Sequence, residues 1–392
     1  MRPAGRAQAA IWVLERILGG RPAEAALTEW ARASRYAGSG DRAAVRDIVF
    51  QALRRRRSAA ALGGARAGEA TGRALVLGLA RAEGLEGEWF DGSPHAPPSP
   101  GPDEAPRPPE GAEALDLPDW LLAPLRDSLG ADFPAVAEAL RHRAPVVLRV
   151  NAARIDRAAA AARLADERIA TRPHPLADFA LEVTSGARGI QASASFAEGL
   201  VELQDAASQA VVEALPLRDD MRVLDLCAGG GGKSLAMAAR AKVTLFAHDA
   251  APRRMADLPA RAARAGASLH LSDRPEADGP FDLVLCDVPC SGSGSWRRDP
   301  AGKWALTPAR LAELLVIQGE ILDRAAGMVA PGGWLSHVTC SFLRQENEDQ
   351  VAAFLARHPG WTCRAQRRFG PIQGGDGFFF ALLTHAGENP ST

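Results

Sequence analysis

The sequence is short of lysine, of paired cysteines and of long apolar runs, and each shortage excludes a class of protein. Lysine occurs only at positions 233, 242 and 303, so nearly every positive charge is a planar guanidinium that suits phosphate. Five cysteines without a CxxC pair argue against a disulfide framework and a structural zinc site, and we expect no metal. No stretch of about 18 uninterrupted apolar residues is present, which argues against a membrane-spanning helix.

Charge and overall composition narrow the class further. The net charge of −1 gives no global signal for nucleic acid. The first residues lead into an amphipathic pattern and not into a signal-peptide core. With 392 residues, 47% of them hydrophobic, the chain is long enough for two or three domains with their own cores. We therefore expect a cytoplasmic globular protein without a membrane partner, whose oligomeric state the sequence leaves open.

Composition divides the chain into four predicted parts. Residues 1–90 carry apolar residues at helical spacing, which predicts a small all-α domain. Residues 91–118 interleave prolines with glycine, serine and acidic residues, which predicts an extended, semi-rigid linker. Residues 119–217 mix helices with short strands and are predicted to form a small α+β module. Residues 218–392 alternate strands and helices, which predicts a Rossmann-like α/β domain.

The fourth part carries six short apolar runs that predict strands of a doubly wound sheet. They cover residues 222–226, 243–248, 269–271, 283–287, 334–338 and 378–383. The best-marked helix is predicted to begin after Thr307 as N-cap, with Pro308 in its first turn, and to end before Pro331. Because open α/β sheets place ligands at the carboxyl ends of their strands, the residues that follow these runs are the candidate site.

A glycine-rich turn follows the first of these strands and opens a helix. It consists of Cys227, Ala228, Gly229, Gly230, Gly231, Gly232, Lys233 and Ser234. A P-loop requires glycine at the position of Cys227, and a dinucleotide fingerprint requires glycine at Ser234, so each fails at one residue. An S-adenosylmethionine loop is favoured by Asp249, which ends the next strand where a carboxylate could accept from ribose hydroxyls. Asp273 ends the following strand and could meet the adenine; alternatively, both aspartates cap the helices after them.

Two cysteines also follow strand ends. Cys290 lies in Asp287-Val288-Pro289-Cys290-Ser291-Gly292 and Cys340 in Thr339-Cys340-Ser341, so both thiols and Asp287 are expected to converge at one rim of the sheet. Methylation of cytosine at carbon 5 needs such groups, because a thiolate must first add to carbon 6 while a carboxyl group near nitrogen 3 stabilises the developing charge. The cysteines at positions 227, 286 and 363 are expected to be inert packing residues.

These motifs resemble those of the RsmB/Nop2/Sun family of RNA cytosine-5 methyltransferases. The matching segments are Asp225-Leu226-Cys227-Ala228 with Gly231-Gly232-Lys233-Ser234, Asp287 to Gly292, Lys303-Trp304 and Thr339-Cys340-Ser341. The resemblance implies that Cys340 is the nucleophile, that Cys290 assists breakdown of the covalent adduct and product release, and that Asp287 stabilises the base. It also implies that S-adenosylmethionine is bound by residues 227–233, Asp249, Arg254, Asp273 and Asp287.

The resemblance extends from about residue 145 to residue 383 and, more weakly, to the N-terminus. Further matching segments are Arg149-Val150-Asn151, Gln204 to Gln209, Asn347-Glu348 and Asp376 to Phe379. The N-terminal helices resemble the NusB-like RNA-binding domain of the RsmB branch, which implies small-subunit (16S) ribosomal RNA as the substrate. This chain departs from the family where Gly229-Gly230 replaces Ala-Pro and Ser234 replaces threonine. Lys233 either neutralises a cofactor carboxylate or lies on the helix surface.

A target cytosine must be single-stranded or flipped, because a duplex hides carbons 5 and 6. RNA contacts are predicted at Arg297, Arg298, Lys303 and Trp304 after Cys290, at Arg149 and Asn151, and at Arg54 to Arg57. Alternatively, Trp304 packs under the following helix. Two other functions stay open: a transfer-RNA methyltransferase of the same chemistry, and a catalytically inactive RNA-binding factor in ribosome assembly.

Overall fold

The computed structural model describes residues 1–385, so the last residues of the predicted fourth part, 386–392, lie outside the described residues. Contacts divide the chain into two units. The helical unit contains residues 1–126, 130–143 and 296–305. The sheet unit contains residues 127–129, 144–295 and those from 306 onward. Within the described residues, no helix is both long and apolar enough to cross a membrane.

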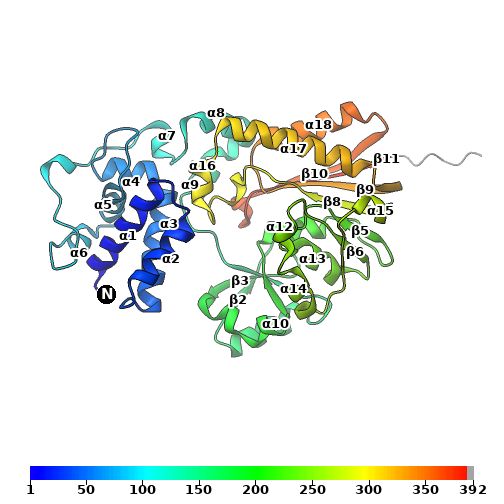
Figure 1. The fold of residues 1–392 in the computed structure, drawn as a ribbon, viewed down its shortest axis with the longest axis horizontal. Coiled ribbons are helices and arrows are strands. Elements are labelled where there is room, and N and C mark those ends of the chain that lie inside the picture. The colour runs from blue at the N-terminus through cyan, green and yellow to red at the C-terminus, as the bar shows by residue number, and fades with distance from the viewer. Residues whose placement is uncertain (386–392) are drawn as a thin grey trace, which may run out of the picture. The chain divides into compact units, whose positions relative to one another are not determined.

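The helical unit is built from consecutive short and medium helices (Figure 1). They are α1 (Pro3–Leu18), α2 (Ala23–Ala33), α3 (Ser39–Arg54), α4 (Arg56–Leu62), α5 (Gly72–Ala82), α6 (Glu86–Trp89), α7 (Gly111–Ala114), α9 (Phe133–Ala139), α16 (Pro300–Ala305) and all of α8 (Asp119–Leu129) except its last three residues. Apolar residues three and four apart line one face of α1 and α3, and Val13, Leu14, Val49 and Leu53 are buried in a common core. The all-α prediction for this region is confirmed.

The predicted linker at residues 91–118 packs on the helical unit and does not extend freely. Asp116 is fully buried and accepts from the backbone N–H groups of Arg57 and Ser58, at 3.0 and 2.8 Å, and from the Ser58 hydroxyl at 2.7 Å. Arg107 donates to the Ala65 carbonyl at 2.9 Å. The prolines of this segment prevent long helices, but they leave carbonyls and charged side chains free to bond to α4 and its neighbours. The linker prediction is therefore wrong.

The sheet unit contains two sheets, and the smaller one is antiparallel. Its strand order is β2-β3-β1-β4, formed by β1 (Val147–Val150), β2 (Ala170–Pro173), β3 (Ala180–Ser185) and β4 (Val201–Leu203). The helices α10 (Arg157–Asp166) and α11 (Ala194–Ala197) accompany it. Leu148, Val150, Leu164 and Leu181 form its buried core. This is the small α+β module that the sequence predicts.

The larger sheet has seven strands in the order β10-β11-β9-β8-β5-β6-β7. They are β5 (Arg222–Asp225), β6 (Thr244–Ala247), β7 (His270–Leu271), β8 (Phe281–Asp287), β9 (Val329–Thr339), β10 (Trp361–Phe369) and β11 (Phe378–His385). Strands β5 to β9 pair in parallel, whereas β11 runs antiparallel to both β9 and β10. From β5 the chain continues to β6 on one side of the sheet, and from β8 it continues to β9 on the other side. The strand order therefore reverses between β5 and β8, and such sheets bind ligands at this position.

Helices cover both faces of this sheet, which explains its continuous apolar strands. On one face, Leu224, Val284 and Cys286 pack with residues of α17 (Pro308–Ala326) and α18 (Glu348–Arg357). On the other, Val223 and Leu285 pack with residues of α12 (Ala206–Glu213) and α13 (Gly232–Arg240). Figure 1 shows α17 and α18 together above the sheet and α13 with α14 (Leu258–Ala265) below it. The predicted Rossmann-like domain and the predicted Thr307 cap of α17 are confirmed.

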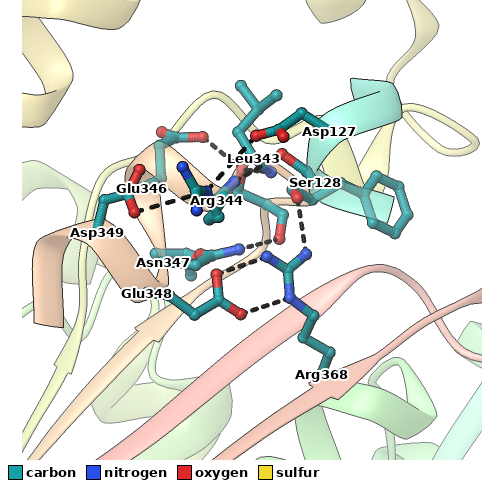
Figure 2. Close-up of polar contacts among 12 residues, drawn as sticks. Asp127, Ser128, Leu343, Arg344, Glu346, Asn347, Glu348, Asp349 and Arg368 are labelled. Atoms are coloured by element: carbon teal, nitrogen blue, oxygen red, sulfur yellow. Dashed lines mark hydrogen bonds and ion pairs between the residues drawn. The ribbon is translucent and has the colours of Figure 1, made fainter. Parts of the chain in front are cut away.

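Around the start of α18, charged residues hold the segment that follows β9 (Figure 2). Arg368 of β10 faces Glu348 of α18, with N···O distances of 2.6 and 2.5 Å. Arg344 lies within 3.6 Å of both Asp127 and Asp349. These pairs anchor the segment that follows β9, which carries part of the site described next.

Candidate functional site

Two thiols meet at the carboxyl ends of β8 and β9. The strands are parallel neighbours in register, with Asp287 opposite Val338, and the Val288 N–H donates to the Val338 carbonyl at 3.0 Å. Three residues after the end of β8 and one after the end of β9, the Sγ atoms of Cys290 and Cys340 lie 3.3 Å apart. The convergence expected from the strand ends is therefore present in the structure.

The two sulfurs are close enough for a hydrogen bond, in which either atom could be the donor. The hydrogen bond with Cys340 and burial raise the pKa of the Cys290 thiol well above its ordinary value. A thiolate is the nucleophilic form of cysteine, and the raised pKa favours the thiol form of Cys290.

Two glycines bring the loop after Cys290 against the chain before β11. The Gly377 N–H donates to the Gly294 carbonyl at 2.9 Å, and the Gly294 N–H donates to the Cys340 carbonyl at 2.9 Å. A Cβ on Gly294 would lie 1.9 Å from the Gly377 carbonyl oxygen, where no side chain can fit. The backbone approach that fixes the cysteine loop therefore depends on glycine.

Asp287 is held by Lys233 and not by a group of its own strand. The Lys233 Nζ lies 2.7 Å from Asp287 Oδ2 and 4.8 Å from the centre of the Phe378 ring. Burial acts to lower the pKa of Lys233, but the charge and hydrogen bond of Asp287 outweigh it, so the pKa is raised and the ammonium form is stabilised. Lys233 is therefore buried and does not lie on the helix surface, which was one of the two possibilities considered from sequence; it links the glycine turn to β8.

The glycine turn is fixed by carboxylates on both sides. The Ser234 hydroxyl donates to Asp225 Oδ2 at 2.6 Å, and burial raises the pKa of Asp225 to about 7. Asp249 accepts from the Gly229 N–H at 3.0 Å through Oδ2. Gly231 has a φ of 77°, and a Cβ there would come within 2.1 Å of the Leu258 side chain, so only glycine fits.

These residues fit the binding of a cationic, ribose-bearing cofactor. Asp225 Oδ1 is buried without a hydrogen-bond partner among the described residues. Burial raises the pKa of Cys227, with further contributions from Asp225, Asp287 and Asp249, so three carboxylates surround the start of the turn. Carboxylates in this position can accept hydrogen bonds from the ribose hydroxyls and the α-amino group of such a cofactor. Arg254 pairs with Asp249 at 3.0 Å and is exposed. Asp273, after β7, is also exposed.

The residues predicted to contact RNA are divided between the two units. By their contacts, Arg297, Lys303 and Trp304 belong to the helical unit. Trp304 Nε1 donates to the Leu53 carbonyl at 2.7 Å, and the buried Lys303 Nζ donates to the Arg54 carbonyl at 3.1 Å. Burial lowers the pKa of Lys303 to about 7. RNA contacts by Lys303 or by the Trp304 indole nitrogen would require these bonds to break.

Arg297 and Arg54 are both largely buried, whereas Arg298 is exposed. The Arg54 guanidinium donates to the Arg297 carbonyl at 2.8 Å, and burial lowers the pKa of Arg54 to about 10. The Arg297 guanidinium donates to the Arg143 carbonyl at 3.2 Å. Two members of the predicted basic clusters therefore have internal partners within the helical unit.

Arg149 and Asn151 are buried inside the sheet unit. Arg149 donates to the Gln204 side chain at 2.7 Å and to the Gly232 carbonyl at 2.6 Å. Asn151 donates to the carbonyls of Gly199 and Ala265. Both side chains therefore connect the small sheet to the segments around it, and the structure gives them internal partners where the sequence predicts RNA contacts.

One buried carboxylate at the site was missed by the sequence reasoning. Glu346 is fully buried after β9 and contacts the residues that follow both cysteines, Ser291 and Ser341. The only signal in the sequence is that each cysteine is followed by serine, which does not by itself predict a common partner.

Two family models match most of the sheet unit. Residues 212–384 match the family model described as 16S rRNA methyltransferase RsmB/F, and residues 117–188 match a model described as the RsmF/B-like ferredoxin-like domain. The chain belongs to the RsmB/F family, whose members are S-adenosylmethionine-dependent methyltransferases. The resemblance inferred from the motifs is confirmed.

A curated relative and two solved structures are similar to this chain. Ribosomal RNA small subunit methyltransferase B of Klebsiella pneumoniae subsp. pneumoniae is 35% identical over 287 residues, which cover 68% of this chain and 65% of the relative. The match thus spans slightly less than two thirds of that relative. The crystal structure of PH0851 superposes with a TM-score of 0.78 over 98% of this chain and 99% of its own, at 22% identity. NSun6 from Pyrococcus horikoshii with SFG has a TM-score of 0.61, at 16% identity, over 69% of this chain and 99% of its own. At these identities, the two structures establish the fold.

Proposed function

We propose that this chain methylates carbon 5 of a cytosine in small-subunit ribosomal RNA, using S-adenosylmethionine. The observation that carries the proposal is the 3.3 Å approach of Cys290 and Cys340 at the edge where Asp287 and the glycine turn also lie. The ribosomal substrate is supported by the name of the curated relative, a small-subunit ribosomal RNA methyltransferase.

The residues divide the chemistry between them. The Cys340 thiolate adds to carbon 6 of the base, which forms a sulfur–carbon bond and moves the electron pair of the C5=C6 double bond towards nitrogen 3. The proton held between Asp287 and the Lys233 ammonium, 2.7 Å apart, would form a hydrogen bond to that nitrogen and so stabilise its charge. Carbon 5 is then electron-rich and able to accept a methyl group.

S-adenosylmethionine, when bound, supplies an electrophilic methyl group. The residues that would hold it are those of the turn at 227–233, with Asp225, Asp249 and Arg254. The Cys290 thiol lies where it can donate to the departing Cys340 sulfur as the proton at carbon 5 is lost to a base and the C5=C6 bond is restored. A sulfur stabilised by this hydrogen bond leaves more readily, which fits a role for Cys290 in product release.

The test measures transfer of labelled methyl groups to protein-free small-subunit ribosomal RNA and, separately, to transfer RNA. We expect 5-methylcytosine with wild type, none with Cys340→Ala, and an RNA–protein adduct stable to denaturation with Cys290→Ala. Cys363→Ala is the matched control, because this free cysteine lies in β10, away from the site. Methylation of transfer RNA alone would overturn the ribosomal substrate; methylation of neither RNA would favour an assembly factor.

A further inference from the structure

Glu346 lies behind both cysteine loops and bonds to each. Its Oε1 accepts from the Ser291 N–H at 2.7 Å, and its Oε2 accepts from the Ser291 and Ser341 hydroxyls. Ser291 directly follows Cys290, and Ser341 directly follows Cys340. A single carboxylate therefore connects the two residues that determine where the thiols lie.

A second buried side chain supports this carboxylate from α17. The Gln318 amide donates to Glu346 Oε1 and to the Pro289 carbonyl, both at 3.0 Å. Pro289 directly precedes Cys290, so the Cys290 loop is held on both sides of the cysteine. Glu346 is thereby supplied with four donors, the number that an ionised carboxylate needs when it is buried away from water.

The hydroxyl groups extend the same connection between the loops. The Ser341 Oγ lies 3.0 Å from the Ser293 Oγ and 3.2 Å from the Ser291 Oγ. The N–H groups of Phe342 and Leu343 donate to Ser293 and Ser341, respectively. The contacts of Ser341 with Ser291 and Ser293, and that of Phe342 with Ser293, cross from one loop to the other, so the spacing of the loops depends on them.

We propose that Glu346 is a positioning residue that fixes the approach of the Cys290 and Cys340 thiols. Its carboxylate touches neither sulfur in the structure and acts through Ser291 and Ser341. The consequence of this position for catalysis rests on the function proposed above, whereas the consequence for the spacing of the thiols does not.

The charge of Glu346 also affects the cysteine pair, because it contributes to the raised pKa of Cys290. The hydrogen bond to Cys340 and burial are the main reasons that the Cys290 pKa is raised, and the charges of Cys340 and Glu346 add to them. Asp287 and Lys233 are the neighbouring charged pair. A positioned anion therefore also helps to keep the proton on Cys290.

The spacing of the thiols can be measured without RNA. The purified full-length protein is equilibrated with reduced and oxidised glutathione, and the fraction with a Cys290–Cys340 disulfide is determined by mass spectrometry. In this reaction the two thiols are oxidised and lose two protons and two electrons, while one oxidised glutathione becomes two reduced molecules. The equilibrium constant gives the effective concentration of one thiol at the other, which reports how closely the two sulfurs are held.

We expect Glu346→Ala to lower this effective concentration about tenfold, since displacements near 1 Å change such proximity terms by up to about a hundredfold. Glu346→Gln should restore most of it, because an amide oxygen can accept from Ser291 and Gln318 while its NH₂ faces hydroxyls that can rotate to accept. Glu348→Ala is the control: it lies on the same segment but pairs with Arg368 (Figure 2).

In methylation assays with ribosomal RNA, substitution of Glu346 should change kcat and not KM. Glu346→Ala should lower kcat about tenfold at an unchanged KM for RNA, and Glu346→Gln should recover most of kcat. If Glu346→Ala melts at a lower temperature but keeps the wild-type effective concentration, Glu346 is only structural and the proposal fails. If Glu346→Ala does not fold, Ser341→Ala must show a smaller change in the same direction. A changed disulfide equilibrium without methylation would leave this inference intact and refute the proposed function.

Discussion

Substitution of Lys233 and substitution of Asp287 should lower the stability of the protein by different amounts. The Lys233 side chain is 8% exposed, whereas that of Asp287 is 31% exposed. Asp287→Asn therefore leaves an ammonium group buried without its partner, and Lys233→Met leaves a carboxylate that water can reach. The two substitutions break the same 2.7 Å contact, yet only the first strands a charge away from solvent.

The magnitudes follow from this difference in exposure. Removal of one partner of a buried pair costs about 3–5 kcal/mol, and an exposed pair is worth about 0.2–1 kcal/mol. We expect Asp287→Asn to lower the free energy of unfolding by about 3 kcal/mol and Lys233→Met by about 1 kcal/mol. The double variant should be no less stable than Asp287→Asn, because the methionine removes the stranded charge and packs on Phe378.

The dependence on pH gives a second check. Because the pKa of Lys233 is raised above its ordinary value of 10.5, the stability from its charge is fully present below 10.5 and is lost only as the pH rises through the raised pKa. The difference between wild type and Lys233→Met should therefore be constant from pH 7 to pH 9 and should shrink in stronger alkali.

The assay is urea-dependent hydrogen exchange of peptides from β5, β8 and β9, which reports on the sheet unit alone and avoids treating two units as one transition. Lys242→Met, a lysine whose side chain has no ion pair among the described residues, is the control. Equal losses for Lys233→Met and Asp287→Asn, or a double variant as unstable as the two losses combined, would refute the reasoning from burial.

Three further predictions concern packing and ionisation. Gly294→Ala should destabilise the sheet unit by more than about 2 kcal/mol in thermal melts, because its Cβ would lie 1.9 Å from the Gly377 carbonyl oxygen. Gly360→Ala is the control and should be near neutral, because a Cβ there would have nothing within 4 Å. Burial lowers the pKa of His337 from 6.5 to about 4, so the unfolded state takes up a proton first and stability should fall by about 3 kcal/mol between pH 7 and pH 4; His337→Asn should flatten this dependence in urea titrations. Trp304→Phe should lower the melting temperature of the helical unit by a few degrees, through loss of a 2.7 Å indole bond worth about 1 kcal/mol, and an unchanged melt would contradict that role.

The strands of the catalytic sheet could be predicted because helices cover both of its faces. A strand such as β8, buried on both sides, is apolar throughout and stands out against the sequence around it. Strand β10 was missed because it forms an exposed edge, where Arg364, Arg367 and Arg368 break the apolar alternation. Charged residues on an edge strand prevent association with other sheets. The same residues remove the apolar alternation by which a strand is recognised in a sequence.

The cysteines and Asp287 could be placed from sequence because a strand end has a known position in a parallel sheet. Partners that come from other elements could not be placed in this way. Nothing local in the sequence indicates that Lys233 reaches Asp287, or that Glu346 bonds to two serines 55 and 5 residues earlier in the chain. Such contacts depend on side-chain directions at the end of a helix or loop, which no periodicity encodes. The buried positions of Arg149 and Lys303 have the same explanation.

Carboxylates from separate segments hold the loops at the carboxyl edge of the sheet. Asp249 accepts from Gly229, Asp287 pairs with Lys233, and Glu346 connects the two cysteine loops. Loops at this edge have N–H groups without strand partners, and a carboxylate can accept from several donors at once. The charges differ in how they are balanced: Glu346 has four donors of its own, while Asp225 keeps one buried oxygen without a partner among the described residues. The carboxylate on the thiol side of the site is thus fully bonded within the chain, whereas the glycine turn keeps an acceptor that no described residue bonds.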